Sequence, residues 1–140
     1  MSANENEMAK ADWTVWAGRI LSGLVVVFLL LDGAMKLIPA APVIETSAQM
    51  GWPTEVSDLR TLGGVLLLST LLYAIPRTSI LGAVLLTGYL GGAVATHVRI
   101  HDPLFSHVLF GVYIGIMLWG GLYLRDRNLR DLFPLKRTES

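Results

Sequence analysis

The chain has 140 residues, of which 53% are hydrophobic and 16% are charged, and eleven basic residues balance eleven acidic ones. Soluble domains carry roughly 25% charged residues, so this chain has too little polar surface for a soluble domain of its length. It contains no cysteine, which excludes thiolate catalysis, disulfide exchange and cysteine-held iron–sulfur clusters. The balanced charge gives no indication of nucleic-acid binding, and the sequence holds no glycine-rich nucleotide-binding motif.

The chain begins with an acidic segment. Glu5, Glu7 and Asp12 outnumber the single basic residue Lys10. A cleavable signal peptide starts with a positively charged region, so this flank does not resemble one. We expect residues 1–12 to form an acidic cytoplasmic segment ahead of the first membrane span.

Four apolar segments are expected to cross a membrane as helices: residues 13–38, 57–75, 78–100 and 104–124. The last two are the clearest, because they hold long stretches without Asp, Glu, Lys or Arg that reach the length of about 20 residues needed to span hydrocarbon. The first two carry charges near their ends. The sequence therefore predicts an all-α integral membrane protein, with a four-helix bundle over residues 13–126.

The connections between the predicted spans differ in length. Residues 39–56 form the one long connection, and residues 44–50 within it are expected to form a short interfacial helix that ends at Gly51. The connections at Pro76 and Pro103 are short, so the spans on either side of each should be antiparallel neighbours.

Basic residues are divided unevenly between the two sides of the predicted bundle. One side holds Arg77, Arg125, Arg127, Arg130, Lys136 and Arg137, and the other holds Lys36, Arg60 and Arg99. By the positive-inside rule, both termini should be cytoplasmic, with residues 127–140 as a basic tail. Aromatic residues that favour the membrane interface are expected near the same face: Trp13, Trp16, Tyr73, Trp119 and Tyr123.

Small residues at helical spacing predict close contacts between helices, as in other membrane bundles. These contacts could lie within one bundle or between two copies of the chain. The candidates are Gly88 with Gly92, Gly111 with Gly115, Gly18 with Ser22, and the pair Gly63 and Gly64.

Polar side chains gather near the outer ends of the predicted spans. At a rise of about 1.5 Å per residue, they would share one level roughly 5–10 Å below the outer surface. Charged groups at such depth are costly and usually functional. The pattern predicts a ligand-binding pocket in the outer half of the bundle, formed by Asp32, Lys36, Arg60, His97, Arg99 and His107.

Pairing within this cluster has two interpretations. Asp32 and Lys36 are spaced i, i+4 and can pair on one helical face. Arg60 is expected as a second partner of Asp32, because the first two spans adjoin through their loop. The alternative is that these charges only neutralise one another and anchor the helix ends, without any ligand.

The three histidines, His97, His101 and His107, lie near Asp102 in the sequence. Three imidazoles can ligate a metal ion, and His97 with His107 on antiparallel helices could hold a haem. However, the Asp102–Pro103 break separates them, and no acidic residue is placed as in a helical metal-binding motif. We therefore predict no metal site and expect histidines that form hydrogen bonds or carry protons.

Several stretches of the sequence resemble the DoxX-like family of small membrane proteins. The similar stretches are residues 81–99, Asp32-Gly33 with Met35-Lys36-Leu37, and residues 72–78, 119–126 and 129–135. The resemblance implies a four-helix protein of the bacterial inner membrane and carries over no catalytic residue. Relatives in this family include a membrane subunit of an archaeal thiosulfate–quinone oxidoreductase, a component associated with oxidative-stress enzymes, and proteins linked to quinone or catechol resistance.

Taken together, the residues and the resemblance predict a non-enzymatic membrane subunit or a protein that binds a quinone-like ligand in redox or stress physiology. No cofactor other than a quinone is expected. The expected partners are the lipid bilayer, a second copy of the chain or a redox enzyme, and not a nucleic acid. A small-molecule permease is the alternative, although few polar residues would line its cytoplasmic half; a purely structural membrane partner is another.

Overall fold

The computed structural model describes residues 2–133, and within this range the chain is helical without strands. The elements are α1 (Ala3–Leu37), α2 (Ala41–Gln49), α3 (Val56–Ala74), α4 (Ser79–Arg99), η1 (Leu104–Val108), α5 (Phe110–Arg125) and α6 (Arg127–Leu132). Four segments are long and apolar enough to cross a membrane: α1, α3, α4 and the segment from η1 through α5. The prediction of an all-α membrane bundle is confirmed.

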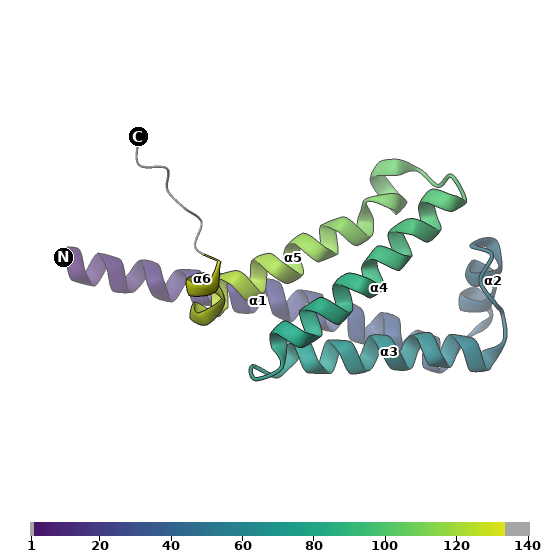
Figure 1. The fold of residues 1–140 in the computed structure, drawn as a ribbon, viewed down its shortest axis with the longest axis horizontal. Coiled ribbons are helices and arrows are strands. Elements are labelled where there is room, and N and C mark those ends of the chain that lie inside the picture. Colours follow the sequence, from purple (N-terminus) through teal and green to yellow (C-terminus); the bar gives the residue numbers. More distant parts are fainter. Residues whose placement is uncertain (1, 134–140) are drawn as a thin grey trace.

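Helix α1 is longer than the span predicted from the sequence. It starts at Ala3, because Ser2 caps it by accepting a hydrogen bond from the Glu5 backbone while the Glu5 side chain accepts one from the Ser2 backbone. The acidic residues therefore form the first turns of the same helix, which extends beyond the other long helices at the N-terminal end (Figure 1). At the other terminus, the last part of the predicted basic tail, residues 134–140, lies outside the described residues.

The short helix and the fourth span differ locally from the expectation. Helix α2 starts at Ala41, with Pro42 in its first turn, and the chain turns at Gly51 with a φ of 69°. The fourth span is a π-helical turn followed by an α-helix, rather than one continuous α-helix. Pro103 immediately precedes the π turn, where it cannot donate a backbone hydrogen bond.

The four long helices adjoin in the order α1, α3, α4, α5, with α5 returning to α1. Figure 1 shows α4 rising away from α3, so that the two are close where they are joined and apart near α2. We call these the Tyr73 end and the α2 end of the bundle. The α2 end is formed by the last turns of α1 and α4, the first turns of α3 and η1, and helix α2.

Tyr73 joins the helices at its end of the bundle. Its side chain is fully buried, and its hydroxyl donates to the carbonyl of Leu118 on α5 at 2.6 Å while lying 2.9 Å from the hydroxyl of Ser22 on α1. The guanidinium of Arg125 lies over the Tyr73 ring and donates to the Tyr73 carbonyl at 3.1 Å. Tyr73 thus lies in the last turn of α3, as expected for a residue near a span end, and its hydroxyl has buried partners in place of water.

Glycines permit the closest helix contacts. A Cβ on Gly18 would lie 2.8 Å from the carbonyl oxygen of Gly121, and a Cβ on Gly63 would lie 2.8 Å from that of Gly33. Gly111 also contacts α4 as expected. In contrast, a Cβ on Gly88 or Gly92 would meet no described atom within 4 Å, so the expected close contact inside the bundle is not formed there. The divergence of the helices toward the α2 end leaves this face of α4 open.

Gly82 provides a test of the packing at the Tyr73 end. A Cβ at Gly82 would overlap the backbone of Tyr73, which no side-chain rotation can relieve. We expect Gly82→Ala to lower the free energy of unfolding by at least about 1–3 kcal/mol, the usual cost of overpacking. The measurement is the midpoint of thermal unfolding in detergent. Gly91→Ala is the control on the same helix, since its Cβ would meet no atom of residues 2–133 within 4 Å. Equal destabilisation by both variants would contradict the packing described for Gly82.

Candidate functional site

A cavity of about 470 Å³ lies at the α2 end, between the diverging helices. Residues of α1, α2, α3, α4, η1 and α5 line it. This volume lies within the range of roughly 300–1,000 Å³ that is typical of small-molecule sites. The cavity is therefore the candidate functional site.

The cavity wall is mainly apolar. Phe28 on α1 and Phe110 on α5 pack edge to face with ring centroids 5.5 Å apart. Gly88 and Gly92 present bare backbone along the α4 wall, which leaves room for a flat group. Polar side chains from several elements complete the lining: Asp32, Lys36, Thr46, Ser47, Tyr89, Thr96, His97 and His107.

Asp32 and Lys36 form an ion pair inside the cavity. The Lys36 ammonium donates to the Asp32 carboxylate at 2.6 Å, and the two side chains are 21% and 31% exposed, respectively. The i, i+4 spacing places both on one face of the last turns of α1. The predicted pair is thus formed, and it neutralises both charges.

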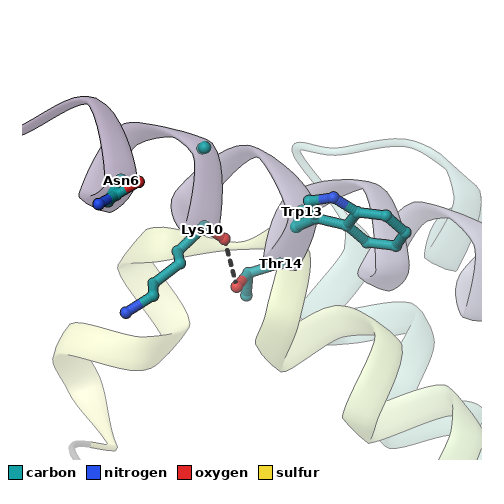
Figure 2. A pocket seen from close by; sticks show the side chains of 5 residues that line it. Asn6, Lys10, Trp13 and Thr14 are labelled. Atoms are coloured by element: carbon teal, nitrogen blue, oxygen red, sulfur yellow. Dashed lines mark hydrogen bonds between the residues drawn. The ribbon is translucent and has the colours of Figure 1, made fainter. Parts of the chain in front are cut away.

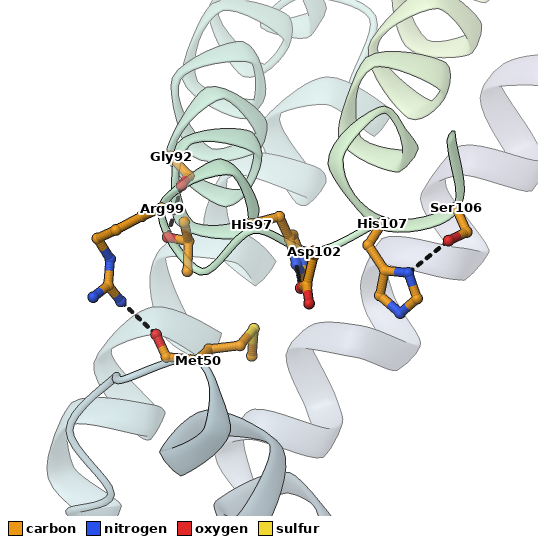
Figure 3. Close-up of polar contacts among 8 residues, drawn as sticks. Met50, Gly92, His97, Arg99, Asp102, Ser106 and His107 are labelled. Carbon is orange, nitrogen blue, oxygen red and sulfur yellow. Dashed lines mark hydrogen bonds and ion pairs between the residues drawn. The ribbon is translucent and has the colours of Figure 1, made fainter. Parts of the chain in front are cut away.

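A second pair joins His97 to Asp102. The His97 Nδ1 lies 2.5 Å from an Asp102 carboxylate oxygen, and the Asp102 backbone N–H donates to the His97 carbonyl at 3.1 Å (Figure 3). The chain reaches this geometry through His101, which has a φ of 59°. The Asp102 carboxylate therefore holds the His97 ring through Nδ1.

His107 approaches His97 from the π turn. The two imidazole rings pack edge to face with centroids 5.9 Å apart, and His107 Nδ1 forms a hydrogen bond with the Ser106 hydroxyl at 2.7 Å (Figure 3). Among residues 2–133, no group of three His, Cys, Asp or Glu side chains is arranged to hold a metal ion.

The two arginines predicted in the pocket do not line it. Arg60 donates to the Leu37 carbonyl at 3.2 Å, and Arg99 donates to the Met50 carbonyl (Figure 3). Within the described chain, Lys36 rather than Arg60 is the ionic partner of Asp32, so the expected Arg60–Asp32 pair is a wrong prediction. Both guanidinium groups instead bind carbonyl oxygens left free where a helix ends. The structure thus brings Asp32, Lys36, His97 and His107 together and places Arg60 and Arg99 outside the cavity.

Sequence reasoning missed several lining residues. Tyr89 lies in an apolar run and was indistinguishable from a packing residue, yet its hydroxyl forms no hydrogen bond with any residue in the range 2–133 and its side chain lines the cavity. Thr46 and Ser47 belong to α2, which was expected to lie at the interface. The i, i+4 spacing of Gly88 and Gly92 predicts a packing contact, whereas both glycines lie in the cavity wall.

A second depression lies on the N-terminal part of α1, at Asn6, Lys10, Trp13 and Thr14 (Figure 2). All its lining residues belong to one helix, and the Thr14 hydroxyl donates to the Lys10 carbonyl within that helix. A site with a single wall cannot enclose a ligand. We therefore assign no function to it.

Comparison with protein families gives one match. The model of the DoxX-like family matches residues 20–121, which is most of the chain. The chain belongs to the DoxX-like family. The matched range contains every residue that lines the cavity. Comparison with curated proteins and with solved structures gives no match. Family membership and the four apolar helices together establish a multi-pass membrane protein.

The Asp32–Lys36 pair can be tested with a double-mutant cycle. If the two charges interact in the cavity, Asp32→Ala and Lys36→Ala should be less than additive, with a coupling of about 0.5–3 kcal/mol in the free energy of unfolding. The physical reason is that removal of one partner leaves the other charge uncompensated. The measurement is thermal unfolding of the three variants in detergent.

Arg60 provides the matched cycle. Its guanidinium binds the Leu37 carbonyl, so Asp32→Ala and Arg60→Ala should be additive. Coupling between Asp32 and Arg60 that equals the coupling between Asp32 and Lys36 would show that the partners are wrongly assigned.

Proposed function

We propose that this protein binds a small, neutral, amphipathic aromatic molecule of the quinone type in the cavity at the α2 end. In this proposal it acts as a non-enzymatic membrane subunit in redox or stress physiology. The proposal rests on the composition of the cavity: its wall is mainly apolar, and the ammonium and carboxylate among its lining residues, Lys36 and Asp32, form an ion pair.

The charge state of the cavity favours a neutral ligand. Lys36 is compensated by Asp32, and Arg60 and Arg99 are turned to backbone carbonyls outside the cavity. An anionic ligand entering this site would lose its water without gaining an uncompensated cation, which is costly. A quinone carries no charge and avoids that cost.

The cavity also offers the contacts that a quinone ring needs. Ring carbonyls accept hydrogen bonds, and the Tyr89 hydroxyl and the Lys36 ammonium are the candidate donors. Phe28 and Phe110 supply aromatic surface for the ring, which prefers offset or edge contacts. The bare backbone at Gly88 and Gly92 allows a flat ring to lie close to α4.

The Tyr73 end gives no support to a permease. Tyr73, Leu118 and Leu122 are buried there, and close glycine contacts fill the space between the helices. Polar groups do occur there, but Ser22, Tyr73 and Ser79 form hydrogen bonds between neighbouring helices and so belong to the packing of the bundle.

Binding is tested by titrating a soluble short-tail quinone into the purified protein in detergent, with calorimetry as the measurement. We expect saturable binding that Tyr89→Phe weakens about tenfold, the effect of losing one hydrogen bond of about 1.4 kcal/mol. Gly92→Leu should abolish binding by filling the cavity. Gly91→Leu is the matched control, because Gly91 does not line the cavity and its Cβ would also meet no described atom within 4 Å.

Two results would contradict the proposal. If the wild-type protein shows no saturable binding, the ligand is not a quinone. If Gly91→Leu and Gly92→Leu lower the affinity equally, the cavity is not the binding site. A sulfonated quinone should bind more weakly than the neutral one, because the cavity has no uncompensated cation among its described lining residues.

We propose that the chain lies in the bacterial inner membrane and that both of its termini are in the cytoplasm. Arg77, Arg125, Arg127 and Arg130 lie at or beyond the Tyr73 end, whereas Lys36, Arg60 and Arg99 lie at the α2 end. The positive-inside rule then directs the cavity away from the cytoplasm.

A C-terminal fusion tests this orientation. We expect an alkaline phosphatase fusion to be inactive and a fluorescent-protein fusion to be bright, since the first is active only outside the cytoplasm. The opposite pattern would show that the termini lie outside the cytoplasm. It would not affect the proposal of quinone binding, which the titration tests separately.

A further inference from the structure

Helix α2 forms the wall of the cavity at the open end of the bundle. Ser47 and Met50 line the cavity from this helix and its last turn, and Ser47 is buried. Figure 1 shows α2 lying beside the region where α3 and α4 are apart. The position of α2 therefore decides how open the cavity is at this end.

The side chains of α2 do little to hold it there. The Thr46 and Ser47 hydroxyls both donate to carbonyls of their own helix, at Pro42 and Val43, at 2.8 Å each. Among the described residues, the side-chain hydrogen bond that joins the segment 41–52 to another helix comes from Arg99. Arg99 is the last residue of α4 and is exposed, and its guanidinium donates to the Met50 carbonyl (Figure 3).

The turn after α2 fits this guanidinium. Gly51 has a φ of 69°, a conformation that side chains disfavour. A Cβ at Gly51 would also lie 3.0 Å from an Arg99 Nη atom. A glycine is thus suited to the position for two independent reasons, the backbone angle and the contact with Arg99.

We propose that Arg99 is a positioning residue that fastens α2 over the cavity through Met50 and Gly51, and thereby controls entry at the α2 end. The identity of the entering ligand rests on the proposed function, whereas the fastening does not. Loss of the Arg99 contact opens α2 and exposes residues inside the cavity to water. Arg99 itself touches no ligand in this arrangement, because it does not line the cavity.

The absence of cysteine from the chain permits a direct test with a single introduced thiol. Thr96 lines the cavity and is 8% exposed, so Thr96→Cys places a shielded thiol behind α2. The measured quantity is the rate of labelling by a water-soluble maleimide in nanodiscs, where both faces of the membrane are accessible. Arg99→Gln should raise this rate about tenfold or more, as expected when a hydrogen bond from a charged donor is lost.

Matched variants separate opening of α2 from general loosening. Arg60→Gln removes the other guanidinium at the α2 end, which binds Leu37, and should leave the labelling rate unchanged. Gly51→Ala changes the α2 side of the contact with Arg99 and should also raise the labelling rate. Arg99→Lys keeps a positive donor and should give a labelling rate between those of the wild type and Arg99→Gln. A thiol at exposed Ser57 should react equally fast with or without Arg99→Gln.

The outcomes are distinguishable from those of the quinone experiment, because labelling requires no ligand. An unchanged rate in Arg99→Gln would overturn the proposal, as would equal acceleration by Arg60→Gln. If Arg99→Gln accelerates labelling but no quinone binds, Arg99 still holds α2 over the cavity, and the ligand of the cavity is not a quinone.

Discussion

The buried hydroxyl of Tyr73 is the interaction on which the arrangement of the bundle depends. It connects α3 to Ser22 of α1 and to the Leu118 carbonyl of α5, while Ser79 of α4 donates to the Tyr73 carbonyl at 2.8 Å. In a membrane, lipid tails are as apolar as the helices, so packing and hydrogen bonds rather than water exclusion bring helices together. At the α2 end, α1 still contacts α3 and α4 still contacts α5 through glycines, whereas α3 and α4 diverge (Figure 1). The cavity lies at this end.

Charge pairing then determines the character of that cavity. A membrane helix carries a charged residue only at a cost, and in α1 Asp32 and Lys36 compensate each other. The guanidinium groups of Arg60 and Arg99 find carbonyl oxygens at helix ends. The cavity therefore combines hydrogen-bonding side chains with an ion pair in which the charges of Asp32 and Lys36 compensate each other.

The sequence predicts what depends on helical periodicity and composition. The four spans and the Asp32–Lys36 pair follow from apolar length and i, i+4 spacing, and both are present. The partners of Arg60 and Arg99 could not be predicted, because a long side chain can reach either a carboxylate or a backbone carbonyl, and only the positions of the helix ends decide between them. Tyr73 was likewise ambiguous, since a tyrosine near a span end suits the interface equally well.

Helix α1 has a structural consequence. Its 35 residues run without interruption from Ala3 to Leu37, a length of about 50 Å at 1.5 Å per residue, against a hydrocarbon thickness of about 30 Å. The helix is therefore longer than the hydrocarbon is thick, and its N-terminal turns continue beyond the other long helices (Figure 1). Since the same helix carries Asp32 and Lys36 near its other end, one uninterrupted element connects the acidic N-terminal turns with the wall of the cavity.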